Sequence, residues 1–317
     1  MADLNLQAYG DILSRETRRY GEALWYYSLA HNRQKVREVV NLLTTYCLVQ
    51  STAFPPVADL DSHLLHLLTN RNAALETHAR QDVEAAQILG RMLSGYATLR
   101  RFYELRDDFD WTTVPPVRWL QQRRRAAAAL VAVIASADDG IRGGLYDAER
   151  DAVVSEDFLL ALLGEATVFF DTATSSSQQQ QAHRHASSAP IVTAHQADTL
   201  LKALEDFETV SPRVHRACID FYSAALTSAP GGVHGSKPSD LLNSGIGGSQ
   251  VLASSALLAS RAHNAFAAGA AARGWDWRTE GNVVAEKQGG DVVRRLRVGL
   301  AAEMARLWVD EADHGVY

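Results

Sequence analysis

The chain has 317 residues, of which 47% are hydrophobic and 21% are charged, and its formal net charge is −6. This length can bury a substantial core, and the composition is that of a globular protein. The weak acidic balance argues against nucleic-acid binding, which usually needs a broad basic surface. No run of apolar residues approaches the roughly 18 needed to cross a membrane, and the N-terminal residues do not resemble a signal peptide. We therefore expect an intracellular protein, cytoplasmic or nuclear, without membrane insertion.

Helical spacing of apolar residues begins at about Tyr9 and continues to Val49. The segment AHNRQ (Ala30 to Gln34) bends this stretch or splits it into two helices. Prolines in the segment FPPV end it, because proline restricts both its own backbone and that of the residue before it. Asp59 or Asp61 then caps a short helix. The leucines expected to point inward from that helix are Leu64, Leu65, Leu67 and Leu68.

A long helix is predicted from about Asn72 to Arg106, with the apolar pattern of an antiparallel bundle helix. The residues expected to point inward from it are Leu75, Ala79, Val83, Ala86, Leu89, Leu93, Tyr96 and either Phe102 or Tyr103. A further helix is predicted over Val117 to Ser136. Ser155 is then expected to cap a helix that continues towards Phe170.

The composition changes at the Ser/Gln-rich tract DTATSSSQQQQAHRHASSAP, which cannot bury enough apolar surface to order itself. We therefore divide the chain into an N-terminal helical region (1–171), a linker or disordered loop (172–190) and a C-terminal helical region (191–317). The two helical regions either share one core or form separate domains. The glutamine run is also suggestive of a eukaryotic source.

Helical patterns resume over Thr193–Thr209, Ser211–Thr227, Ser249–Ala272 and Asp291–Asp313. The residues expected to point inward from the last helix are Val293, Leu296, Leu300, Met304, Leu307 and Trp308. Cys47 and Cys218 both lie in helical apolar patterns, which predicts buried free thiols. No segment alternates as a strand does. The prediction is an all-α protein, an irregular multi-helix bundle or short α-solenoid of about nine or ten helices.

Two acidic-aromatic segments, RDDFDWTTVPP and ARGWDWRTEGN, each lie between a predicted helix and a loop that leads to another helix. Tryptophan can wedge between helices while a neighbouring aspartate accepts hydrogen bonds from exposed backbone amides. We interpret both segments as structural corners. The residues assigned this structural role are Asp110, Trp111, Trp275, Asp276 and Trp277.

The cluster Asp107, Asp108 and Asp110 is the strongest indication of an enzyme in the sequence. It is similar to the aspartate-rich motif with which class I isoprenoid synthases, themselves all-α, hold Mg²⁺ and diphosphate, and clustered carboxylates suit a hard cation. The family pattern DDxxD or DDxxE is not met, however, because Trp111 and Thr112 occupy its final positions. His63 and His66 form a second weak metal candidate, with a core or boundary position as the alternative interpretation.

Candidate partner-binding residues come from three places in the sequence. Tyr26 and Tyr27 cannot both occupy the centre of one buried stripe, so Tyr26 is a candidate anchor for a partner. The glycine-rich turn DDGIRGGLYD contributes Arg142 and Tyr146. Two arginine clusters could bind phosphates or an acidic partner, or could form solvated helix faces. These clusters are Arg123, Arg124 and Arg125, and then Arg294, Arg295 and Arg297.

No arrangement of residues for nucleophilic catalysis and no cofactor-binding motif is recognisable in the sequence. The interpretation is therefore a non-catalytic helical scaffold, adaptor or assembly subunit of an intracellular multiprotein complex, with other proteins as its partners and no cofactor. The alternative is an Mg²⁺-dependent enzyme of the isoprenoid-synthase kind. The third hypothesis is a helical module that binds phosphate or RNA.

Overall fold

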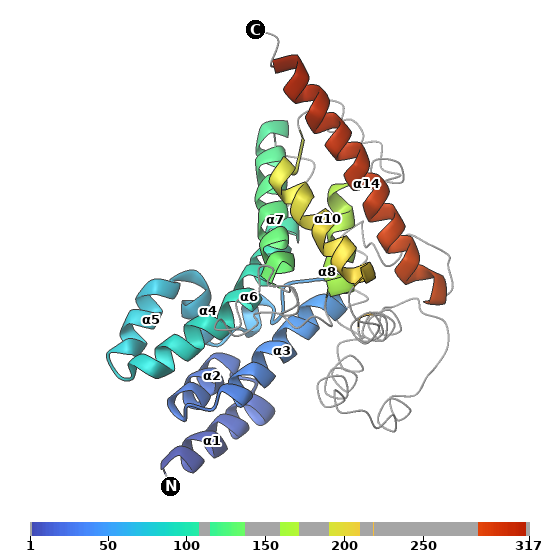
Figure 1. Cartoon of the computed structure of the whole chain (residues 1–317). Helices are drawn as coiled ribbons and strands as arrows, with labels where there is room; N and C mark the ends of the chain where they lie inside the picture. The colour runs from blue at the N-terminus through green and yellow to red at the C-terminus, as the bar shows by residue number, and fades with distance from the viewer. Residues whose placement is uncertain are drawn as a thin grey trace.

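The computed structural model describes residues 2–107, 115–136, 159–170, 190–209, 218 and 285–314. Within these residues it contains ten α-helices and no strand, which confirms the all-α prediction. The helices form two groups that meet at the centre of the molecule (Figure 1). The N-terminus lies at the outer end of one group and the C-terminus at the outer end of the other.

The first group comprises six helices, and the longest connection between them is the proline-containing loop from Ser51 to Asp61. The helix α2 packs on α1, α3 and α4, and α5 packs on α4 and α6, while α6 also contacts α2 and α3. The helices are α1 (Ala2–Ile12), α2 (Tyr20–Leu29), α3 (Arg33–Gln50), α4 (Ser62–Thr69), α5 (Arg71–Ala79) and α6 (Val83–Asp107).

The second group comprises four helices, in which α7, α10 and α14 pack around α8. The helix α7 also packs along α6. The helix α14 lies against α8 and α10 and forms the outer edge of this group (Figure 1). The helices are α7 (Pro116–Ser136), α8 (Leu159–Ala166), α10 (Ala194–Thr209) and α14 (Ala285–His314). The predicted helix Val117–Ser136 is therefore confirmed.

The stretch from Tyr9 to Val49 breaks twice, once more than its apolar pattern predicted. The predicted break at AHNRQ is present, with His31 in a left-handed conformation (φ 49°) and the Asn32 side chain accepting a hydrogen bond from the Lys35 amide (3.0 Å). A further break follows α1, where a short π-helical turn, Leu13–Thr17, ends at Arg18 with φ 56°. Asp61 caps α4, because its side chain accepts a hydrogen bond from the Leu64 amide at 2.9 Å. Of the two predicted caps, Asp59 and Asp61, the structure therefore confirms Asp61.

The prediction of one continuous helix from Asn72 to Arg106 is wrong. The chain turns after α5, and the His78 carbonyl accepts hydrogen bonds from the amides of Gln81 (2.9 Å) and Asp82 (3.0 Å). The Asp82 side chain then caps α6 by accepting from the Ala85 amide at 2.9 Å. This cap lets α5 fold back against α6 rather than extend into solvent. Val83, expected to point inward, is 59% exposed at the turn.

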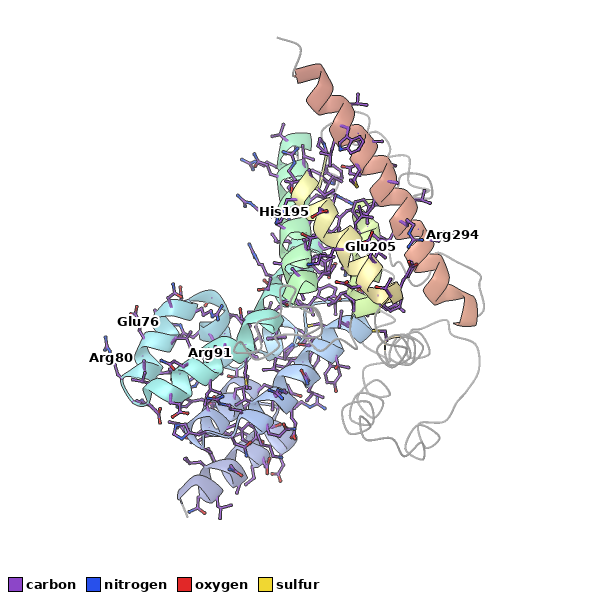
Figure 2. All side chains as sticks on the ribbon, in the orientation of Figure 1. Glu76, Arg80, Arg91, His195, Glu205 and Arg294 are labelled. Carbon is purple, nitrogen blue, oxygen red and sulfur yellow. The ribbon has the colours of Figure 1, made fainter. Side chains whose placement is uncertain are left out.

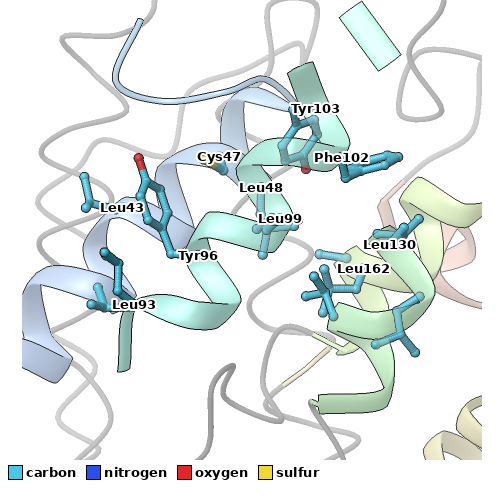
Figure 3. Packing of buried hydrophobic residues seen from close by; sticks show 14 of the residues in the cluster. Leu43, Cys47, Leu48, Leu93, Tyr96, Leu99, Phe102, Tyr103, Leu130 and Leu162 are labelled. Carbon is cyan, nitrogen blue, oxygen red and sulfur yellow. The ribbon is translucent and has the colours of Figure 1, made fainter. Parts of the chain in front are cut away.

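The hydrophobic core is continuous across both groups of helices. Leu43 and Cys47 of α3 face Tyr96 of α6, while Leu130 of α7 and Leu162 of α8 extend the same cluster (Figure 3). Both Phe102 and Tyr103 are buried, because α6 packs against helices of both groups at this level. The core includes residues from 13 to 300, so it joins helices of both predicted helical regions.

Near the C-terminal end of α14, the residues that point inward are not all the ones that the sequence predicted. Val293, Leu296 and Leu300 are buried as expected, but Trp308 is 70% exposed. Glu303 takes the next inward position, where its Oε1 atom accepts a hydrogen bond from the Ile191 amide at 3.2 Å. In α4, likewise, Leu65 is 41% exposed, against the prediction that it points inward.

Cys47 and Cys218 are both buried free thiols, as their apolar surroundings predicted. Burial raises the pKa of Cys47 to about 12, so this thiol is protonated at neutral pH. No helix in the described part of the chain has the length and apolar character needed to span a membrane.

Candidate protein-binding surface

The packing of α1 on α2 separates the two adjacent tyrosines that the sequence could not distinguish. Tyr27 is buried, and its hydroxyl donates a hydrogen bond to Asp11 Oδ1 at 2.7 Å. Gly10 makes this close approach possible, because a Cβ there would lie 2.7 Å from the Tyr27 Cε1 atom. Tyr27 is therefore part of the core and not available to a partner.

Tyr26 lies at the edge of this core, where its ring packs edge-on against Tyr9 with centroids 4.7 Å apart. Tyr9 itself is 46% exposed, and Leu4 and Ile12 on the same helix are 68% and 47% exposed. These four residues, Leu4, Tyr9, Ile12 and Tyr26, are referred to below as the α1 surface. Aromatic side chains that combine an apolar ring with a polar hydroxyl are common anchors at protein interfaces.

The arginines Arg123, Arg124 and Arg125 of α7 have different surroundings. The Arg123 guanidinium lies 5.0 Å from the centroid of the Trp119 ring and donates to the Val168 carbonyl. Arg124 Nε donates to the Pro190 carbonyl at 3.0 Å. These two arginines therefore tie α7 to neighbouring segments, while Arg125 is exposed. The polar side chains labelled in Figure 2 lie likewise on outer surfaces of both groups.

In the second arginine cluster, Arg297 forms an exposed ion pair with Glu208 and thereby links α14 to α10. Arg294 is exposed and Arg295 half-buried on the same helix. Several other predicted site residues lie outside the described residues. These are Arg142 and Tyr146 of the glycine-rich turn, Asp108 and Asp110 of the acidic cluster, and Trp111, Trp275, Asp276 and Trp277 of the two predicted corners.

The one described member of the acidic cluster has protein partners. Asp107, the last residue of α6, accepts from Arg106 Nε at 2.7 Å and from the Thr52 hydroxyl at 3.4 Å. In the described ranges no three His, Cys, Asp or Glu side chains gather as metal ligands would. Asp107 serves there to hold the end of α6 beside the turn after α3.

The two histidines of the predicted pair, His63 and His66, lie in different surroundings. The His63 ring stacks on His78 with centroids 5.1 Å apart, and His78 stacks in turn on Trp25 at 3.9 Å. His66 is exposed. Burial, followed by the neighbouring His63 and His66, lowers the pKa of His78 to about 4. His78 is therefore neutral at physiological pH and contributes to packing between α2, α4 and α5.

A buried ion pair joins the two helix groups, and the sequence analysis did not anticipate it. Arg106 Nη1 of α6 donates to Glu165 Oε2 of α8 at 2.9 Å, and the Glu165 side chain is fully buried. The Tyr103 hydroxyl donates to the other carboxylate oxygen at 3.0 Å, and Arg106 Nη1 also reaches the Ser51 hydroxyl at 2.8 Å. A single glutamate in the otherwise apolar segment LLALLGEATVFF is the signal that could have revealed this pair.

The charges of this pair stabilise each other. Burial by itself would lower the pKa of Arg106, but the carboxylates of Glu165 and Asp107 outweigh it and raise that pKa. Burial, together with Glu165, raises the pKa of Tyr103 well above its usual range, so its hydroxyl remains a donor. The cluster of Ser51, Tyr103, Arg106 and Glu165 is thus a structural junction.

A second buried arginine, Arg100, holds the proline loop after α3. Its Nη1 donates to the Pro55 carbonyl at 2.5 Å and its Nε to Glu104 at 2.9 Å. The Tyr96 hydroxyl donates to the neighbouring Phe54 carbonyl at 2.6 Å. The loop that the prolines forced out of helical geometry is therefore held by polar side chains of α6.

One curated protein provides a clear sequence match. The chain is 54% identical over 317 residues to the nucleoporin NUP85 of the fungus Chaetomium thermophilum, in an alignment that covers 97% of this chain. The chain spans about a quarter of that relative, since the alignment covers 26% of it. The chain is thus similar to part of a nucleoporin. No protein-family model matches the sequence, and no solved structure matches it significantly.

Proposed function

We propose that this chain is a helical part of a non-catalytic scaffold subunit of the nuclear pore, where it binds other proteins. The observation that carries the proposal is the 54% identity to nucleoporin NUP85 over 97% of the chain. Identity at this level over nearly every described helix implies the same core and the same helix packing. The proposal agrees with the scaffold role, protein partners and intracellular location expected from the sequence.

The chemistry of the described residues supports a binding role for this chain. The buried charged side chains Arg100, Arg106 and Glu165 are engaged in contacts that hold helices or loops together. Asp107, the described residue of the enzyme alternative, is paired with Arg106. Six of the ten exposed large apolar side chains in the described residues lie on the two outermost helices, α1 and α14, which is where a subunit of an assembly meets its neighbours.

Within this function, the α1 surface is the proposed contact site around Tyr26. Its aromatic pair, Tyr9 and Tyr26, is fixed by α1–α2 packing, so little conformational entropy is lost when a partner binds. The Arg125 side chain and the glycine-rich turn with Arg142 and Tyr146 are further proposed contact points.

The proposal is tested by tagging the chain in its source cells. We expect the tagged chain to concentrate at the nuclear envelope and to co-purify with other proteins at constant molar ratios, measured by quantitative mass spectrometry. Leu4→Ala, at a position 68% exposed on the α1 surface, should weaken at least one of these associations and leave the thermal unfolding midpoint nearly unchanged. Val57→Ala, at a position 68% exposed outside the α1 surface, is the matched control. A chain found throughout the cell without stoichiometric partners would disprove the scaffold role.

A further inference from the structure

The helix α14 has apolar side chains on two opposite faces. Its inner face carries Val293, Leu296 and Leu300, which are buried against the second helix group. Eight described residues between Arg297 and Val309 are exposed, and six of these are apolar. The six, referred to below as the α14 outer face, are Val298, Ala301, Ala302, Ala305, Trp308 and Val309.

The spacing of these residues gives one continuous stripe. At about 100° per residue, the six positions cover roughly 120° of the helix circumference, on the side away from the buried leucines. The stripe is about 16 Å long, which is three helical turns. Val298, Trp308 and Val309 are 65%, 70% and 59% exposed, so large apolar side chains lie at both ends with alanines between them.

This pattern favours a helix as the occupant. The alanines allow a neighbouring backbone to approach closely, and the larger side chains at the ends fix its position along α14. A solvent-exposed helix of a monomer would ordinarily carry polar residues at these positions. An exposed tryptophan is also a costly residue to retain on a free surface, and tryptophan is enriched among the residues that dominate binding energies.

The charges beside the stripe indicate the chemistry of that helix. At helical spacing Arg297 lies along one edge of the stripe and Arg306 along the other. Arg294, labelled in Figure 2, is near the N-terminal end of the stripe. The ion pairs of Arg297 with Glu208 and of Arg306 with Glu303 leave the arginine side chains 52% and 44% exposed. Between Val293 and Val309, the part of α14 whose side chains the structure describes, the sequence has four arginines and one acidic residue, Glu303, which is buried on the inner face. Both edges of the stripe are therefore basic along this part of the helix.

We infer that the α14 outer face binds an amphipathic helix of another protein subunit, apolar along one stripe and acidic along both of its edges. The inference rests on the proposed scaffold function and specifies one of its contacts. The apolar stripe supplies the area that is removed from water, and the acidic edges pair with the arginines and set the orientation.

Photo-crosslinking tests which molecule occupies this face. Trp308 is replaced by the photoreactive residue benzoylphenylalanine in the full chain in source cells, and the crosslinked peptides are identified by mass spectrometry. We expect crosslinks to a segment of a different protein that has apolar residues at helical spacing flanked by Asp and Glu. Crosslinks to a second copy of the chain, to another segment of the same chain, or to no protein would overturn the inference.

A synthetic peptide of the crosslinked segment then measures the contact. Val298→Glu and Trp308→Glu should each weaken peptide binding by at least tenfold in fluorescence polarisation, because each places a carboxylate against the apolar stripe of the bound helix and beside its acidic edges. Val117→Glu is the matched control, since Val117 is 67% exposed on α7, and it should bind as the unchanged chain does. The affinity should fall as salt is added. Equal binding by all three variants would disprove the proposed surface.

Co-purification separates the two proposals. If Val298→Glu retains every stoichiometric partner of the unchanged chain, the α14 outer face is not a binding surface, but the scaffold function stands. If the unchanged chain has no stoichiometric partner, both proposals fail. Both substituted positions are exposed, so circular dichroism and thermal unfolding should be unaffected and loss of binding would not reflect unfolding.

Discussion

The outermost helices of the two groups, α1 and α14, pack inward in the same way but differ in what they leave outside. Each has a glycine against an aromatic residue, Gly10 against Tyr27 and Gly299 against Phe170. The helix α1 has 11 residues and exposes a small surface around Tyr9, whereas α14 has 30 residues and exposes an apolar stripe of three turns. The helix α14 therefore has apolar side chains for contacts on both its inner and its outer side.

The largest expected effect is at the junction that joins the two groups. Glu165→Gln leaves Arg106 with only the less buried Asp107 as counter-charge, so we expect a loss of up to about 3–5 kcal/mol of unfolding free energy. Chemical denaturation measures it. Glu208→Gln makes the same change at an exposed ion pair, and there the loss should be below about 1 kcal/mol. Equal effects at the two sites would contradict the structural role of the junction.

The two interhelical glycines test the inward packing of the outer helices directly. A Cβ at Gly299 would lie 2.3 Å from Phe170 Cβ, close to the backbone, so Gly299→Ala should cost about 1–3 kcal/mol. Gly10→Ala should cost less, because its Cβ meets the outer part of the Tyr27 ring. Thermal unfolding measures both.

Gly90→Ala provides the reference for those glycine substitutions. A Cβ at Gly90 approaches the flexible end of Leu75 at 3.0 Å, so the higher helix propensity of alanine should offset the contact. A stabilised Gly299→Ala would show that α14 does not pack closely on Phe170.

In the first helix group, His78 should make the free energy of unfolding depend on pH. Its pKa falls from 6.5 to about 4 on folding, so the unfolded chain binds more protons between these values. Stability from this group is fully present above pH 6.5 and is lost as the pH falls towards 4, by up to about 3 kcal/mol for a pKa change of this size. His78→Phe keeps an aromatic ring beside Trp25 and should flatten the unfolding free energy across this range. An unchanged pH profile would mean that His78 titrates normally.

The smallest effects are expected at the outer surfaces themselves. Trp308→Ala and Leu4→Ala remove side chains that are 70% and 68% exposed, so each should change stability by less than about 0.5 kcal/mol. Thermal unfolding of the isolated chain checks this. A loss of several kcal/mol at Trp308 would show that α14 is already covered there by its own chain.

Apolar periodicity and capping residues predicted most of the described helices. The helix Val117–Ser136 and the cap by Asp61 came directly from local pattern, because both depend on residues within a few positions of each other. The break at Asp82 was missed, since the turn contains neither proline nor glycine and depends on α5 packing back against α6. Tyr26 and Tyr27 were recognised as a pair, but only α1 packing decided which one is buried.

The sequence by itself determined the all-α class, the positions of many helix ends and the buried state of both cysteines, because short-range spacing and side-chain caps specify these features. Tertiary structure decided the rest. The pairing of Arg106 with Glu165 spans 59 positions in the chain and follows from how α6 and α8 are packed. The exposure of Trp308 was decided in the same way, since a helix with two apolar faces does not reveal which one its own core will bury.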